Sequence, residues 1–262
     1  MRIDNVIFGV NADPMYYQFW NTVSKIFKVK FGIHPVLCFC GNVKPEYNLG
    51  EDYGTIIEFP IAEDVPEYLH ATWVRFYCAK MFPDAVCLLG DIDMLPISRN
   101  FYIDNLVDVS DDHFTHILAD AYCPGDFDRW RQHVKDYTVP AHHHVAKGSL
   151  YQDVFRFEDT WIKEIRKFAN TKLGVPHPER PGWTYWCADE VYPTIMMRAY
   201  CDNGGIIQTP GYTQKMLSRP YHHYTQEDLS SDRYFACHSP RPYAMHMEWI
   251  DKLTIDILRS GS

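Results

Sequence analysis

The first half of the chain alternates short apolar runs with longer segments in which apolar residues recur every three or four positions. The runs cover residues 6–10, 35–39, 55–59 and 85–89. Each has the length of a strand and is bounded by polar, proline or glycine residues. The run 85–89 is typical of a strand that is covered on both faces, as in a parallel sheet.

Two amphipathic segments between these runs predict helices. The apolar stripe of the first consists of Tyr16, Phe19, Trp20, Val23 and Phe27. Asp13 and Pro14 precede it in the positions of a helix cap and a first turn. The stripe of the second consists of Leu69, Trp73, Phe76 and Tyr77, and we expect Asp64 to cap this helix. The resulting order β-α-β-β-α-β favours an α/β layer fold.

The second half is less regular. We expect strands at 114–118, near 142–146 and at 206–209. We expect one long helix with Val154, Phe157, Trp161, Ile165 and Phe168 on one face, a helix over 190–200 with Pro193 in its first turn, and a last helix over 248–258. Residues 210–243 are rich in Tyr, His, Pro and Ser, too polar and broken for a core, and they predict a mobile cover.

The composition indicates a globular chain with a sizeable core, since 46% of its 262 residues are hydrophobic. A formal net charge of −9 argues against a broad basic surface for nucleic acid or anionic lipid. There is no signal-peptide pattern and no transmembrane segment of about 18 apolar residues, so we expect a cytoplasmic protein. The eight cysteines form no C-x-x-C pair, which favours buried free thiols over disulfides or zinc.

Candidate chemistry is concentrated after the 85–89 run, where Asp91 and Asp93 are separated by one residue. Side-chain alternation along a strand directs both carboxylates to the same side. Adjacent acids repel, so they need a cation, hydrogen-bond donors or water to remain ionised. Asp120 similarly follows the expected strand at 114–118. Acids at the ends of such strands suggest a shared crevice, because open α/β sheets bind ligands at that edge.

In this setting the run Cys87-Leu-Leu-Gly-Asp-Ile-Asp93 resembles the D-x-D region of nucleotide-sugar glycosyltransferases with the GT-A fold. The first strand, the aromatic helix after it and residues 71–80 share the resemblance. It implies an α/β fold with a mixed, mostly parallel central sheet flanked by helices. It also implies a single GT-A-like domain over 1–262, with a nucleotide-binding half, 1–120, and an acceptor-binding half with a closing loop, 121–262.

The same resemblance implies a divalent cation at the two acids. Asp93 would ligate Mn²⁺ or Mg²⁺ directly, and Asp91 would meet the metal, a metal-bound water or the ribose of the donor. The alternative is a capped turn in which both carboxylates accept backbone N–H bonds from residues 94–97.

Four further residues are candidates for binding the nucleotide. Asn11 and Asp13 follow the first strand, where the family receives the base and ribose, although Asp13 also fits a helix cap. Lys215 and Arg219 lie in a segment bounded by glycine and proline and would close over the diphosphate to exclude water. A solvated surface loop is the alternative for this pair.

A candidate catalytic base lies before the helix at 190–200. Trp186-Cys-Ala-Asp189-Glu190 resembles the segment that carries an acid near the acceptor hydroxyl in inverting GT-A enzymes. Asp189 is the first candidate for the base and Glu190 the second. Acids in a first helical turn also complement the helix dipole. Trp183, Tyr185 and Trp186 beside them would form a stacking platform for a sugar, or simply pack.

Histidines are numerous, and the family implies one late histidine as a metal or diphosphate contact, either His238 or His246. Of the consecutive histidines 142–144, only His142 and His144 would face one side of a strand, which does not favour a zinc site. We expect Arg75, on the helix before the acids, to be exposed.

Together these features predict a metal-dependent glycosyltransferase that moves a hexosyl or pentosyl group from a nucleoside diphosphate, with UDP favoured, to a glycan or sugar hydroxyl. Inversion with Asp189 as base is favoured over retention. The alternatives are a non-catalytic carbohydrate- or nucleotide-binding module, and a metal-dependent phosphohydrolase or nucleotidyltransferase. No P-loop, nucleophile elbow or dinucleotide fingerprint occurs.

Overall fold

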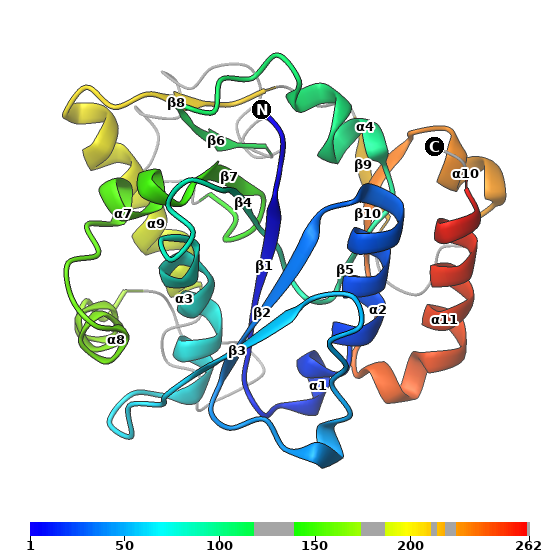
Figure 1. Cartoon of the computed structure of the whole chain (residues 1–262), viewed down its shortest axis with the longest axis horizontal. Helices are drawn as coiled ribbons and strands as arrows, with labels where there is room; N and C mark the ends of the chain where they lie inside the picture. The colour runs from blue at the N-terminus through cyan, green and yellow to red at the C-terminus, as the bar shows by residue number, and fades with distance from the viewer. Residues whose placement is uncertain (118–138, 174–186, 211–213, 218–223, 261–262) are drawn as a thin grey trace.

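A seven-stranded mixed sheet forms the centre of the structure, with the strand order β3-β2-β1-β4-β7-β6-β8 (Figure 1). The structure is a computed structural model, and it describes residues 1–117, 139–173, 187–210, 214–217 and 224–260. The strands are β1 (Asn5–Val10), β2 (His34–Cys40), β3 (Thr55–Phe59), β4 (Val86–Leu89), β6 (Phe114–His116), β7 (His144–Lys147) and β8 (Ile207–Gln208). Neighbours pair in parallel except at β4–β7 and β6–β7. The predicted fold class, a mixed and mostly parallel sheet flanked by helices, is confirmed.

The strands of the first half lie where the apolar runs predict them. β1, β2, β3 and β4 each overlap a predicted run, and the order β-α-β-β-α-β is confirmed. The strands β6, β7 and β8 are shorter than predicted. Asp120, expected at the end of β6, lies outside the described residues.

Helices cover both faces of this sheet (Figure 1). On one face lie α3, α7, α8 and α9, and on the other lie α2 and α11. The α-helices are α1 (Pro14–Tyr17), α2 (Trp20–Ile26), α3 (Glu67–Ala79), α4 (Arg99–Tyr102), α7 (Gly148–Phe155), α8 (Trp161–Asn170), α9 (Ala188–Asp202), α10 (Gln226–Ser230) and α11 (Tyr243–Arg259). A π-helix, η1 (Phe27–Phe31), continues α2, and two 3₁₀ turns are η2 (Pro45–Tyr47) and η3 (Asp104–Leu106).

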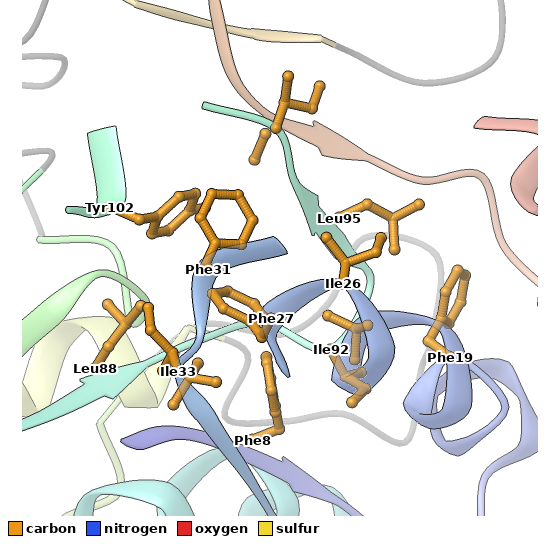
Figure 2. Packing of buried hydrophobic residues seen from close by; sticks show 14 of the residues in the cluster. Phe8, Phe19, Ile26, Phe27, Phe31, Ile33, Leu88, Ile92, Leu95 and Tyr102 are labelled. Carbon is orange, nitrogen blue, oxygen red and sulfur yellow. The ribbon is translucent and has the colours of Figure 1, made fainter. Parts of the chain in front are cut away.

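Alternate residues of the strands feed two separate apolar clusters, one on each face of the sheet. Ile7 of β1 joins the cluster under α3, whereas the next residue, Phe8, joins the cluster under α2 and α11. Figure 2 shows the second cluster, in which Phe27 packs against Phe8 and edge-on against Tyr102 of α4, with ring centroids 5.7 and 5.5 Å apart. These contacts fix the faces of the sheet and leave its carboxyl edge for polar residues.

A glycine allows α3 to lie close against β1. A β-carbon at Gly9 would lie 2.1 Å from the backbone oxygen of Ala71 on α3 and 2.9 Å from Cγ1 of Val74. Only a residue without a side chain permits this approach. The close contact brings the next turn of α3, which carries Arg75, to the edge of the sheet where β1 and β4 end.

Three predicted details of the helices are wrong. Asp64 does not cap α3, because the cap is Pro66 and Asp64 instead binds the guanidinium of Arg166. The single long helix after β7 is two helices, α7 and α8, because Arg156 adopts a left-handed φ of 52° that ends α7. Pro193 lies inside α9, beyond its first turn.

The prediction that residues 210–243 form only a polar cover is also wrong. Within the described residues, β9 (Lys215–Leu217) and β10 (Tyr234–His238) join β5 (Met94–Pro96) in a second sheet with the order β5-β10-β9. Three consecutive residues of β10, Phe235 to Cys237, are buried in the core. This small sheet ties the late part of the chain to the segment that directly follows the D-x-D acids.

Two predictions from composition can be compared with the structure. The cysteines at 38, 40, 78, 87, 187, 201 and 237 are free thiols, and most are buried, as predicted for these described positions. None of the helices in the described ranges combines the length and apolar character that spanning a bilayer requires.

Candidate active site

A cavity of about 360 Å³ lies at the carboxyl edge of the sheet, where β1 and β4 end. The predicted site residues that line it are Asn11, Asp13, Asp91, Asp93, Asp189, Glu190 and His238. They come from the end of β1, the turn after β4, the start of α9 and the end of β10. Segments far apart in the sequence therefore converge on the edge at which open α/β sheets bind ligands.

Asp91 is held by two cationic or polar side chains. Its Oδ1 accepts a short hydrogen bond from the guanidinium of Arg75, and its Oδ2 lies 3.1 Å from Nδ1 of His142. Burial alone would raise the pKa of Asp91, but Arg75 and His142 outweigh it and hold the pKa well below its usual range. Asp91 is therefore an ionised carboxylate.

Arg75 connects the D-x-D turn with α9. Its side chain is 6% exposed, and besides Asp91 it donates to the Gly90 carbonyl oxygen at 2.9 Å and to Oδ2 of Asp189 at 3.1 Å. Burial alone would lower the pKa of Arg75, but the two carboxylates outweigh it and raise the pKa. The expectation that Arg75 is exposed is wrong.

Asp93 faces a second pair of side chains, a histidine and an arginine. Its Oδ2 lies 3.1 Å from Nε2 of His238 and 3.3 Å from Nε of Arg241. The N–H of Ser239 also donates to the backbone oxygen of Asp93 at 2.9 Å, which fixes the end of β10 against the turn. The guanidinium of Arg241 in turn lies over the ring of Tyr16, 5.1 Å from its centroid, and donates to its hydroxyl at 2.5 Å.

These partners exclude the capped-turn alternative for the two acids. The N–H of Met94 bonds to the backbone oxygen of Asp91 and not to a carboxylate. The N–H of Ile97 bonds to the carbonyl of Phe235 on β10. The carboxylates of Asp91 and Asp93 are therefore engaged by side chains at a cavity wall.

Asp189 lies in the first turn of α9 with its side chain 15% exposed. Burial raises its pKa, Arg75 opposes this rise, and Asp91 adds to it, so that the net shift is upward. Glu190, the second candidate, also lines the cavity. Asp189 is thus a carboxylate whose basicity is above normal beside a cavity.

Asn11 and Asp13 have structural roles as well as places on the wall. Oδ1 of Asn11 accepts from the N–H of Asp13 at 3.3 Å, and Oδ1 of Asp13 accepts from the N–H of Met15 at 2.9 Å. The helix cap predicted for Asp13 is confirmed. Because both side chains line the cavity, capping does not prevent them from facing a ligand.

Two of the remaining candidates, Lys215 and His246, do not line this cavity. Lys215 is exposed on β9, and its neighbour Met216 lines the cavity instead. His246 lies on α11 and is not among the lining residues, so His238 is the late histidine that reaches the acids. Arg219 and the aromatic residues at 183, 185 and 186 lie outside the described residues.

Sequence reasoning missed the role of three cavity residues, Arg75, His142 and Arg241. Arg75 is the one Asp, Glu, Lys or Arg in residues 68–79, which is a readable signal of a buried charge. The run of histidines at 142–144 does not predict the carboxylate partner of His142, and Arg241 has no local pattern that marks it.

The donor types at the cavity suit a hard divalent cation. Asp93 offers a carboxylate oxygen and His238 an imidazole nitrogen at the same point of the wall. Within the described residues, no three His, Cys, Asp or Glu side chains form a preassembled metal site. Cations that bind together with substrate phosphates need only one or two protein ligands, so the pair fits this type of site.

Comparison with known proteins identifies the fold. No family model and no curated protein matches the chain. The chain is similar to the galactosyltransferase LgtC in complex with donor and acceptor sugar analogs, with a TM-score of 0.53 and 12% identity over 95% of each chain. An active-site mutant of LgtC gives 0.52 at 12% identity, over 95% of this chain and 94% of that chain. The glycosyltransferase GlyE of Streptococcus pneumoniae gives 0.38 at 10% identity, over 96% and 83%. The likeness to LgtC establishes the GT-A-like fold that the D-x-D resemblance implies.

Proposed function

We propose that the chain is a metal-dependent glycosyltransferase that moves a sugar from a nucleoside diphosphate, with UDP favoured, to a hydroxyl of a glycan or another sugar. The observation that carries the proposal is the cavity at the carboxyl edge, which combines the D-x-D carboxylates, two histidines, two arginines and a separate basic carboxylate. The fold supports it, because LgtC is a galactosyltransferase of this fold that was crystallised with donor and acceptor sugar analogs.

Asp93 and His238 would hold the cation, Mn²⁺ or Mg²⁺, with the diphosphate oxygens of the donor completing its ligands. When bound, such a cation neutralises the charge that develops on the departing diphosphate. Asp91 is committed to Arg75 and His142, so we assign it to the donor side of the cavity, toward ribose, sugar or a metal-bound water.

Arg241 is the cation that we assign to the diphosphate, in place of Lys215 and Arg219. It lies on the cavity wall between Asp93 and Tyr16. Asn11 and Asp13 at the end of β1 lie on the same side as Tyr16 and would meet the base and ribose. A guanidinium suits phosphate because its donors form a planar fork.

Asp189 would accept the proton of the acceptor hydroxyl. Its raised pKa makes it a stronger base than an ordinary carboxylate, and Arg75 holds its orientation through Oδ2. Direct displacement with this base inverts the anomeric configuration. Nuclear magnetic resonance of the product tests this step, because retention of configuration would remove Asp189 from the role of base while leaving the transferase assignment intact.

The decisive experiment for the proposal is calorimetric titration with UDP, with and without Mn²⁺, on the wild type and on Asp93→Asn. We expect UDP to bind in the presence of Mn²⁺, and Asp93→Asn to weaken that binding by at least about tenfold, because it removes a direct ligand. The matched control is Asp104→Asn, whose side chain is 52% exposed on η3 away from the cavity lining. Equal affinities in wild type and Asp93→Asn would remove the metal role.

Product analysis separates the proposal from its alternatives. Free nucleoside diphosphate together with a glycosylated acceptor marks sugar transfer, and the mass of the added group distinguishes hexose from pentose. A released nucleoside monophosphate would mark attack at phosphorus, as a phosphohydrolase or nucleotidyltransferase performs. Donor binding without transfer to any hydroxyl, including water, would indicate a non-catalytic binding module.

A further inference from the structure

Asp93 carries two nitrogen partners on a single oxygen. Nε2 of His238 and Nε of Arg241 both lie at Oδ2, 3.1 and 3.3 Å away. The Asp93 side chain is 7% exposed, so this oxygen has little access to solvent that would screen a third charge. A divalent cation that bound through Oδ2 would therefore compete with the Arg241 guanidinium for the same atom.

Arg241 also contacts a second residue, Tyr16, on the side of its guanidinium away from Asp93. Its guanidinium donates to the hydroxyl of Tyr16 at 2.5 Å and lies over the Tyr16 ring. Tyr16 lines the cavity beside the end of β1. Arg241 thus spans from the carboxylate at which we place the metal to the wall at which we place the nucleotide. A side chain that leaves Asp93 can keep its contact with Tyr16 and remain in the cavity.

Electrostatics then determine when Arg241 can leave. A divalent cation and a guanidinium at one carboxylate repel each other strongly at a separation of a few ångström in a partly buried site. A diphosphate removes this conflict, because it supplies several negative oxygens that can bind the metal and the guanidinium at once. The diphosphate therefore favours the arrangement in which Arg241 has left Asp93.

We propose that Arg241 makes metal binding depend on the diphosphate, because it competes with the cation for Asp93 and is drawn away by the donor. This inference rests on the proposed function and adds an order to it: the cation binds weakly by itself and tightly with the nucleotide. As a consequence, the cation does not occupy the site until a donor is present. Because coupling is reciprocal, Mn²⁺ and nucleoside diphosphate raise each other's affinity by the same factor.

The test is the affinity for Mn²⁺ measured by electron paramagnetic resonance of the free ion, in the absence of nucleotide and with saturating UDP. In the wild type we expect UDP to raise the Mn²⁺ affinity by about 5- to 150-fold, the usual range for coupled sites. In Arg241→Gln we expect Mn²⁺ alone to bind at least about tenfold more tightly than in the wild type. UDP should then raise the Mn²⁺ affinity by a smaller factor than in the wild type, because only the direct bonds from the diphosphate to the cation remain. Arg241→Lys keeps the charge and should restore part of the coupling.

Arg233→Gln is the matched control, because it removes the same type of residue just before β10 from a position with a 60% exposed side chain. It should leave both Mn²⁺ affinities unchanged, which separates competition at Asp93 from a general change of charge. Far-ultraviolet circular dichroism confirms that each variant is folded. If Arg241→Gln did not fold, the smaller change Arg241→Lys would carry the test through a measurable drop in coupling.

The outcomes distinguish this inference from the proposed function. If Mn²⁺ and UDP bind together but Arg241→Gln leaves the affinity for Mn²⁺ alone unchanged or lower, then Arg241 only binds phosphate and the inference is wrong. If neither wild type nor variant binds Mn²⁺ with or without UDP, the proposed function itself fails.

Discussion

Buried histidines on the sheet predict that the protein loses stability in mild acid. His116 on β6 and His144 on β7 are fully buried, with ring centroids 4.7 Å apart. Burial, with a smaller contribution from nearby His142, lowers the pKa of His116 to about 3, although the backbone of His143 opposes the shift. Burial likewise lowers the pKa of His144 well below its usual value. In mild acid these two histidines therefore bind protons in the unfolded chain but not in the folded protein.

The size of the effect follows from proton linkage. In the unfolded chain a histidine titrates near pH 6.5, so between about pH 7.5 and pH 5 it takes up a proton that folded His116 does not. This uptake favours the unfolded state by about 2 kcal/mol per histidine at pH 5. The contribution of each buried neutral histidine to the free energy of unfolding is fully present above pH 6.5 and is lost as the pH falls below that value.

The assay is urea unfolding of the wild type and of His116→Phe at both pH values, followed by fluorescence and circular dichroism. We expect the wild type to lose about 2 kcal/mol more than His116→Phe when the pH is lowered, because all other groups titrate in both proteins. Phe114→Leu is the control, since it disturbs the ring that packs on His144 without removing a titrating group. Phe114→Leu should be less stable than the wild type by the same free energy of unfolding at both pH values.

The reasoning would be refuted by an equal loss of stability in wild type and His116→Phe. That result would mean that His116 takes up its proton in the folded protein. It would also contradict the complete burial of the ring, because a charged imidazole at this site would require water or a carboxylate next to it.

Three further predictions concern α3 and are checked by urea unfolding. Gly9→Ala should cost about 3 kcal/mol or prevent folding, because the added carbon meets the Ala71 backbone oxygen at 2.1 Å; no loss would show that α3 can move away. Trp73→Leu should cost about 3 kcal/mol, because this buried ring is the centre of an aromatic cluster. Arg75→Gln should cost about 3 kcal/mol by leaving carboxylates unpaired, and adding Asp189→Asn should recover part of that loss; strictly additive effects would contradict the ion pair.

The parts of the fold that the sequence predicts correctly are those with a local cause. β1 to β4 are short apolar runs between breaking residues. Successive side chains of a strand point to opposite faces, so the position of a residue in the run decides which face of the sheet it covers. The break between α7 and α8 has no such cause, because apolar residues continue at helical spacing through it. Val154 before Arg156 and Trp161 after it still pack into one cluster, so the spacing of apolar residues does not reveal the change of direction.

The small sheet was missed for a related reason. β10 has a buried centre of only three residues, and it follows a polar segment rich in tyrosine and histidine. Its partner β5 lies about 140 residues earlier, at Met94–Pro96, so nothing in the neighbourhood of β10 indicates the pairing. The contact of His238 with Asp93 depends on this pairing, which is why the sequence left His238 and His246 as equal candidates.

The burial of Arg75 could have been inferred from the sequence, and the argument applies to other helices. Residues 68–79 contain one Asp, Glu, Lys or Arg, and the buried residues of α3 lie on all of its sides. A helix that is apolar all round is covered all round. A charge in its middle must then be buried and must have counter-charges, because an unpaired buried ion is too costly. Asp91 and Asp93 follow the next strand and are therefore expected at the edge of the sheet beside the helix, and Asp91 is indeed a partner of Arg75. A single cation within the buried, otherwise uncharged part of a helix before a D-x-D turn therefore predicts an ion pair with that turn.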